Sequence, residues 1–171
     1  MRVRKDTVVV WLVFLLLAGT FWAMMKMEHS GLTRSKSGEI VSSLRTLKTA
    51  MLALYADHAD SIDQYGRIDG QAIEDFIESD EGRRKLKEYM PGDALTLKGK
   101  SAVPGEYKLT SEASSRSWFV GYGLKSTEDM NARRKLAARA SRDGLLNYSA
   151  VASPPYNGKL TQWVWMQILG E

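Results

Sequence analysis

The chain has 171 residues, of which 44% are apolar and 26% charged, and this composition excludes a wholly disordered protein. Its formal net charge is +4 at pH 7, and residues 1–25 carry +2 of it, since Arg2, Arg4 and Lys5 outweigh Asp6. The remaining +2 is too small to predict a nucleic-acid-binding protein. The chain contains no cysteine, which excludes disulfides, zinc–thiolate sites and cysteine nucleophiles.

The first recognisable element is an uncharged segment over residues 7–25, within which residues 8–18 are all apolar. Because about 20 residues at 1.5 Å each span the hydrocarbon core of a bilayer, we predict a transmembrane helix over 7–25. The basic residues in front of it predict that residues 1–6 form a cytoplasmic leader and that the rest of the chain lies outside.

A cleaved secretory signal is the alternative interpretation of this segment, because such signals also combine a basic start with an apolar core. Phe21 and Trp22 are bulky where small residues normally precede the cleavage site, so a retained anchor is favoured. A secreted enzyme, released by cleavage, would require a mature N-terminus near Ala23.

Residues 26–60 are predicted to extend the N-terminal helix outside the membrane. Their apolar residues recur at spacings of four and three, which is a heptad seam along one helix face. We expect this seam to pack the helix onto the head; it comprises Ile40, Leu44, Leu47, Met51 and Leu54.

The remainder, residues 61–171, is predicted to be a globular head. Asp69-Gly70 is a turn signal, and Ile73, Phe76 and Ile77 then follow at helical spacing. Ser79 is expected to cap a second short helix, which has acids early and bases late, as the helix dipole favours.

Beyond Pro91-Gly92 apolar residues recur at every second position. This alternation predicts strands over 94–98, around Tyr107 and over 118–124. In the last of these, Gly121 and Gly123 share one face, so we expect another element, such as a helix, to pack closely there.

Residues 131–142 are predicted to form a basic helix that stops at Gly144, and residues 160–169 a final strand. The expected fold class is therefore α+β. A long N-terminal helix, membrane-spanning in its first half and amphipathic in its second, packs on a small antiparallel β-sheet with additional short helices.

Three stretches resemble the type IV pilin and pseudopilin superfamily. The similarity lies in the Leu-Lys-Thr-Ala run and the Tyr-Ala-Asp ending of residues 39–57, in residues 118–124, and in residues 135–146 together with the strand around Trp165. The resemblance implies a structural subunit in the bacterial inner membrane. Its partners would be the membrane and other pilin-like subunits, within a type IV pilus or a type II secretion-type filament.

The candidate processing region is Lys5, Asp6 and Thr7, and it departs from the family pattern. The glycine that precedes the family's cleavage site is missing, and Val10 stands near the position of the family's glutamate. These departures favour a minor subunit. They also keep open a tethered extracytoplasmic binding or sensing domain with no filament role.

No enzymatic motif is present: the chain has no Gly-x-Ser-x-Gly turn, no glycine-rich phosphate loop, and only two histidines. We therefore predict no catalytic activity and no cofactor. Asp57, Asp60 and Asp63 cluster near His58, but their spacing matches no calcium loop and fits a solvated helix end, so no metal site is predicted.

Two groups are candidates for partner contacts. Arg133 and Arg134 lie on the basic helix, where a solvated face is the ordinary explanation and an acidic neighbour the alternative. Trp163 and Trp165 alternate onto one face of the final strand, where they either complete a core or dock a partner.

Overall fold

The computed structural model describes residues 36–58, 62–63, 67–68, 71–90, 96–112, 117–125, 130–158 and 162–169. Residues 37–171 belong to one compact unit. Within the described residues, no helix is both long and apolar enough to cross a membrane. The predicted leader and transmembrane helix, residues 1–25, lie outside these ranges, as does the processing region.

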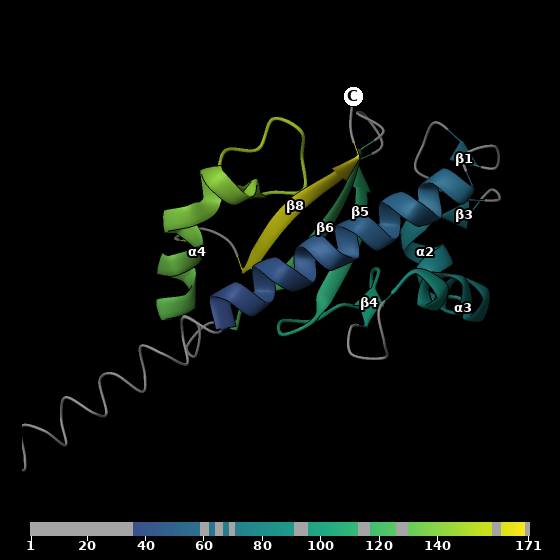
Figure 1. Ribbon diagram of the computed structural model, residues 1–171, viewed down its shortest axis with the longest axis horizontal. Helices are drawn as coiled ribbons and strands as arrows, with labels where there is room; N and C mark the ends of the chain where they lie inside the picture. The colour runs from purple at the N-terminus through teal and green to yellow at the C-terminus, as the bar shows by residue number, and fades with distance from the viewer. Residues whose placement is uncertain are drawn as a thin grey trace, which may run out of the picture. The chain divides into compact units, whose positions relative to one another are not determined.

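A single long helix, described over residues 36–57, supplies one whole layer of this unit (Figure 1, purple to blue). Its apolar side chains recur every three or four residues and are each at most 2% exposed: Ile40, Val41, Leu44, Leu47, Ala50, Met51 and Leu54. Glu39, Arg45 and Thr49 are exposed on its other faces. The helix is therefore amphipathic, and each large buried side chain stabilises the fold by about 1.5–3 kcal/mol.

The second layer is a five-stranded sheet in the order β4-β5-β6-β8-β7. The strands are β4 (Leu97–Lys98), β5 (Tyr107–Glu112), β6 (Ser117–Gly123), β7 (Leu145–Leu146) and β8 (Trp163–Leu169). All neighbours are antiparallel except β4 and β5, which run parallel.

The expectation of an antiparallel sheet was therefore wrong at β4. Parallel strands need a connection that returns the chain to its starting end, which normally takes a dozen or more residues. Because β4 is only two residues long, residues 99–106 suffice to make this return. The sheet is mixed, and the fold is α+β.

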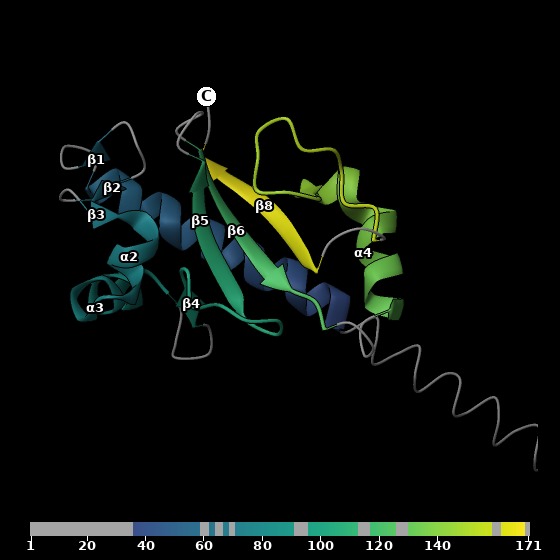
Figure 2. The ribbon, with the colours of Figure 1, turned by 180° about the vertical axis from the view of Figure 1, so that it is seen from behind.

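The long helix packs across one face of the sheet, in front of it in Figure 1 and behind it in Figure 2. Side chains of this face belong to the same core cluster as the helix seam: Leu109, Trp118, Val120, Leu124, Val164, Met166 and Ile168. Tyr55 of the helix meets Trp118 edge to face, with ring centroids 5.5 Å apart and planes at 85°. This arrangement is a favourable one for aromatic pairs.

The opposite face of the sheet carries Gly121 and Gly123, and here the expectation of a helix was wrong. A Cβ atom on Gly121 would lie 2.4 Å from the Trp165 ring. One on Gly123 would lie 2.8 Å from Pro104 Cα and 3.2 Å from the Trp163 ring. The two tryptophans come from the neighbouring strand β8 and stack at 5.6 Å. Gly121 thus makes room for the Trp165 ring, and Gly123 makes room for the loop backbone at Pro104 as well as for the Trp163 ring.

Helices and short strands complete the head. A small antiparallel sheet, β1 (Ile62–Asp63), β2 (Arg67–Ile68) and β3 (Gln71–Ala72), precedes α2 (Ile73–Glu78) and α3 (Asp80–Tyr89). The predicted cap is confirmed, because Ser79 Oγ accepts a hydrogen bond from the Gly82 amide at 3.0 Å. Helix α4 (Met130–Asp143) ends at Gly144, whose φ of 67° suits glycine.

Replacing Leu47 with alanine should lower the free energy of unfolding by about 2–5 kcal/mol, because it leaves a cavity at a completely buried position. Thr49→Ala, on the exposed side of the same helix, is the matched control. Chemical denaturation followed by circular dichroism measures both variants, and equal stabilities would contradict the packing described here.

Gly121→Ala should destabilise the head by about 1–3 kcal/mol, because the new methyl group would overlap the Trp165 ring. Gly38→Ala is the control, since Gly38 is helical and a Cβ there has nothing within 4 Å. That change should be stabilising by up to about 1 kcal/mol. Thermal unfolding compares the two, and a neutral Gly121→Ala would show that Trp165 is not held against the strand.

Candidate interaction surfaces

The helix residues expected to pack against the head lie inside it. Ile40, Leu44, Leu47, Met51 and Leu54 are between 0% and 2% exposed and share one core cluster with the sheet. Their side chains are therefore not available to a second molecule. Contacts with a partner through this part of the chain must use the other faces of the helix or the surface of the head.

The long helix and α4 are joined by an ion pair. Arg45 Nη2 donates to Asp143 Oδ1 at 3.1 Å, and the Asp143 side chain is only 2% exposed. Arg139, one turn earlier on α4, donates to the other carboxylate oxygen, and Arg142 Nε lies 3.4 Å from Oδ1. One nearly buried carboxylate thus holds three guanidinium groups and fixes α4 against the helix.

The charges around Asp143 decide its ionisation. Burial on its own would raise the pKa of this carboxyl, but the hydrogen bond and charge of Arg139, with Arg142, outweigh it and hold the pKa below its usual value. The carboxylate therefore stays ionised at neutral pH. An unpaired charge at this position would be costly, so the arginines are required for it to be tolerated.

Sequence reasoning did not identify Asp143, although a local signal exists. Helix α4 is otherwise basic, and an acid in its last turn opposes the helix dipole. Arg139 stands four residues before Asp143, a spacing that places the two side chains together on a helix. The third partner, Arg45, is 98 residues away in sequence, so that pairing had no local signature.

The two arginines proposed as partner contacts differ in their surroundings. Arg133 Nη2 donates to the carbonyl of Leu124 at 3.0 Å, which fastens α4 to the end of β6. Arg134 is exposed. Of this pair, Arg134 has the placement that a contact with another molecule requires.

Trp163 and Trp165 lie together on the sheet face opposite the long helix. Trp165 is 7% exposed, and Trp163 stacks on it with an angle of 24° between the ring planes. Lys108 Nζ, from β5, lies 5.6 Å from the centre of the Trp163 ring, within cation–π distance. Most of the surface of the two indole rings is therefore in contact with other residues of the head.

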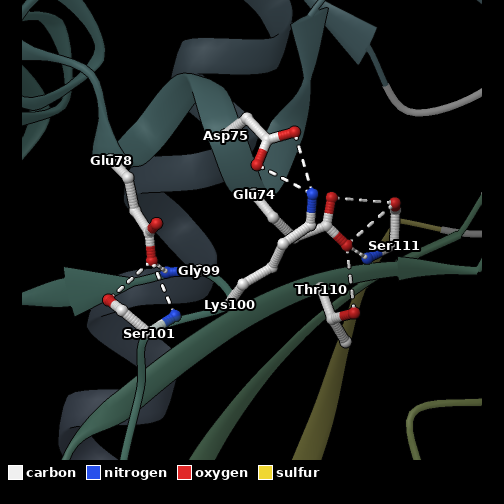
Figure 3. A network of polar contacts seen from close by, with 8 residues as sticks. All are labelled: Glu74, Asp75, Glu78, Gly99, Lys100, Ser101, Thr110 and Ser111. Carbon is white, nitrogen blue, oxygen red and sulfur yellow. Dashed lines mark hydrogen bonds and ion pairs between the residues drawn. The ribbon is translucent and has the colours of Figure 1, made fainter.

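Helix α2 holds the β4 side of the sheet through carboxylates (Figure 3). Glu74, 9% exposed, accepts hydrogen bonds from the Ser111 amide at 2.7 Å and from Thr110 Oγ1 at 3.0 Å. Asp75 binds Lys100 Nζ at 2.8 Å. This network was also missed from the sequence, because it joins segments 25 to 37 residues apart.

Glu78, the last residue of α2, binds the turn that follows β4. Its Oε1 accepts from the Gly99 amide at 2.9 Å, the Ser101 amide at 3.0 Å and Ser101 Oγ at 2.7 Å. The hydrogen bonds from Ser101 and Gly99 lower the pKa of this carboxyl. Strand edges with unpaired amides invite pairing with other chains, and Glu74 occupies one such amide, that of Ser111 in β5.

The acidic cluster near His58 is only partly described. Asp57 accepts a hydrogen bond from the Tyr89 hydroxyl at 2.6 Å, whereas Asp60 lies outside the described residues. Among the residues that the structure describes, no group of three or more histidine and acidic side chains is placed to hold a metal ion.

Comparisons with protein families, with curated proteins and with solved structures return no match to this chain.

Asp143→Asn should lower the free energy of unfolding at pH 7 by about 1–3 kcal/mol, because three arginines lose their charged partner. The folded pKa of Asp143 is below its ordinary value of 3.8, so its contribution is present above pH 4 and is lost as pH falls further. Denaturation between pH 7 and pH 2 should therefore show a flatter acid decline in Asp143→Asn than in the original protein.

The control for this prediction is Asp80→Asn, because Asp80 is fully exposed and lies 3.8 Å from Arg83. That variant keeps all three arginine contacts of Asp143, so it should not show the flattening expected of Asp143→Asn. An Asp143→Asn profile that is parallel to the original over the whole range would show that Asp143 does not titrate as described.

Proposed function

We propose that the chain is a membrane-anchored, pilin-like structural subunit or minor pseudopilin that contributes to a type IV pilus or a type II secretion-type filament. In this proposal residues 7–25 span the bacterial inner membrane with residues 1–6 in the cytoplasm. The head, residues 61–171, lies outside and is joined to the anchor through residues 26–60.

One observation carries this proposal: the helix over residues 36–57 forms one core with the sheet of the head, and an uncharged segment precedes this helix in the same chain. The seam of this helix is buried in the head, and a buried helix close in sequence to an apolar segment suits a subunit of a membrane-derived assembly.

The sequence around Thr7 makes a minor subunit the better proposal. A main filament subunit of this family is expected to carry the glycine and glutamate that are missing here. A subunit present in few copies would tolerate both departures.

The second candidate, a tethered binding or sensing domain outside the membrane, is favoured by the same departures. It needs the anchor but no contacts between anchors of neighbouring copies. The two candidates therefore differ in whether the apolar segments of different copies touch one another.

This difference can be tested directly because the chain has no cysteine of its own. Single cysteines placed at successive positions of residues 8–17 should, on oxidation in native membranes, form disulfides between copies or with another membrane protein at one helix face. Non-reducing gels of the full chain, produced at its natural level, give the pattern. Crosslinking at every position would indicate random collision.

Arg134→Cys provides the control for topology, since this exposed residue lies in the head. A membrane-impermeant maleimide should label it in spheroplasts, whereas Lys5→Cys should react only after the membrane is opened. No crosslink at any position, with this labelling pattern intact, would reject the filament subunit in favour of the tethered domain. Head cysteines that are protected in spheroplasts would reject both candidates.

A further inference from the structure

The surface formed by α4 and the neighbouring side of the long helix carries more positive charge than the structure neutralises. Asp143 is the only acid among the described residues 130–158 and 162–169. Its single carboxylate is shared by three arginines, Arg45, Arg139 and Arg142. These bonds do not cancel the excess, because one negative charge offsets only one of the three cations.

Two further cations enlarge this excess. Lys48 lines the same hollow as Arg45 and Asp143. Arg134 lies two turns before Arg142 on α4, so these two residues share a helix face. Neither Lys48 nor Arg134 forms a hydrogen bond or an ion pair with another residue that the structure describes. Five cations less the Asp143 carboxylate leave a net charge of +4 on this basic surface, which comprises Arg45, Lys48, Arg134, Arg139 and Arg142.

Other charges near α4 do not remove this excess. Arg133 and Lys135 have interactions of their own, so they are not part of the basic surface. Glu128 and Asp129 precede α4 in the sequence and lie outside the described residues. Their two negative charges would still leave the basic surface at +2, even with both acids directly beside it.

The exposed face of α4 suits contact with a flat anionic surface. It contains no acid and comprises Met130, Asn131, Arg134, Ala138, Ser141 and Arg142. Because Ala138 and Ser141 are small, the guanidinium groups of Arg134 and Arg142 can both reach one plane. Met130 is 57% exposed at the start of the helix and adds an apolar group, which a membrane interface accepts.

The position of this surface in the head favours a membrane as its partner. Figures 1 and 2 show α4 beside the beginning of the long helix (purple), with α2 and α3 at the other end. Residues 26–35, which join this helix to the uncharged segment 7–25, span at most about 40 Å when fully extended. A tether of this length raises the effective concentration of lipid headgroups at the basic surface far above that of a soluble acidic partner.

We propose that the basic surface docks the head onto the phosphate groups of anionic phospholipids, on the membrane from which the chain emerges. The proposal rests on the anchor of the proposed function, but not on assembly into a filament. Arg134 and Arg142 would bind lipid phosphates, and Met130 would enter the headgroup layer. Each basic residue close to an anionic membrane strengthens docking by about fivefold, and salt weakens this attraction.

The test measures energy transfer from a fluorophore on the full chain to acceptors on lipid headgroups, in nanodiscs that hold one chain each. The fluorophore is attached to Ala138→Cys, on the exposed face of α4, or to Thr96→Cys, which is exposed in front of β4. We expect high transfer from position 138 in discs that contain phosphatidylglycerol, and low transfer in zwitterionic discs or in high salt. Position 96 should respond less to the lipid and to salt.

Two double variants that remove equal charge separate the basic surface from the rest of the head. Lys48→Gln with Arg134→Gln breaks no described ion pair and should lower the ratio of docked to undocked chains about 25-fold, at roughly fivefold for each charge. Arg83→Gln with Arg84→Gln removes the same charge from α3 and should change this ratio by less than about twofold. Circular dichroism checks that each variant is folded.

The outcomes distinguish the docking from the anchor. Low transfer from position 138 in phosphatidylglycerol discs, with the chain eluting together with the discs, would overturn the docking and leave the anchor intact. A chain that does not enter the discs would reject both. Equal transfer in anionic and zwitterionic discs, or equal effects of the two double variants, would also overturn the proposal. High transfer that requires two chains in one disc would assign the basic surface to contacts between copies instead.

Discussion

The head depends on burial of one face of the long helix against one face of a small sheet. No disulfide can hold the layers together, because the chain has no cysteine. Leu44, Leu47, Met51 and Leu54 are each 0% exposed, and the sheet side chains opposite them complete the same cluster. Without the helix, that sheet face would lie open to water, so the helix is a structural member of the head.

Polar contacts set the positions of the helices relative to the sheet, which apolar burial alone does not determine. Apolar packing is non-directional, whereas hydrogen bonds to charged groups are directional and of the order of 1.5–3 kcal/mol. Asp143 joins α4 to the long helix through Arg45, and Glu74 joins α2 to β5. On the far side of the sheet, Leu146 bridges to Pro155, which has no amide hydrogen to offer another strand. The two edges of the sheet are thus protected differently: Glu74 binds an amide at the β5 edge, and Pro155 lies beside β7.

The sequence predicts those features of the structure that depend on residues close together in the chain. The heptad spacing of the long helix, the Ser79 cap and the alternation of β6 are local patterns, and the corresponding elements are present. The pairing of Arg45 with Asp143 and the binding of Ser111 by Glu74 join segments far apart in the chain, and no local period encodes them. The parallel direction of β4 had no local signal either. At Gly121 the sequence indicated a close neighbour but not that the neighbour was Trp165. Lys5, Asp6 and Thr7 lie outside the described residues.

The direction of the long helix has a mechanical consequence. Because its seam lies along the sheet from Ile40 to Leu54, tension applied at Ser37 along the helix axis would load these contacts in shear. All the interlocked side chains would have to move past one another at the same time. Tension perpendicular to the axis would instead peel the helix away one turn at a time. The head should therefore resist an axial pull far better than a sideways one.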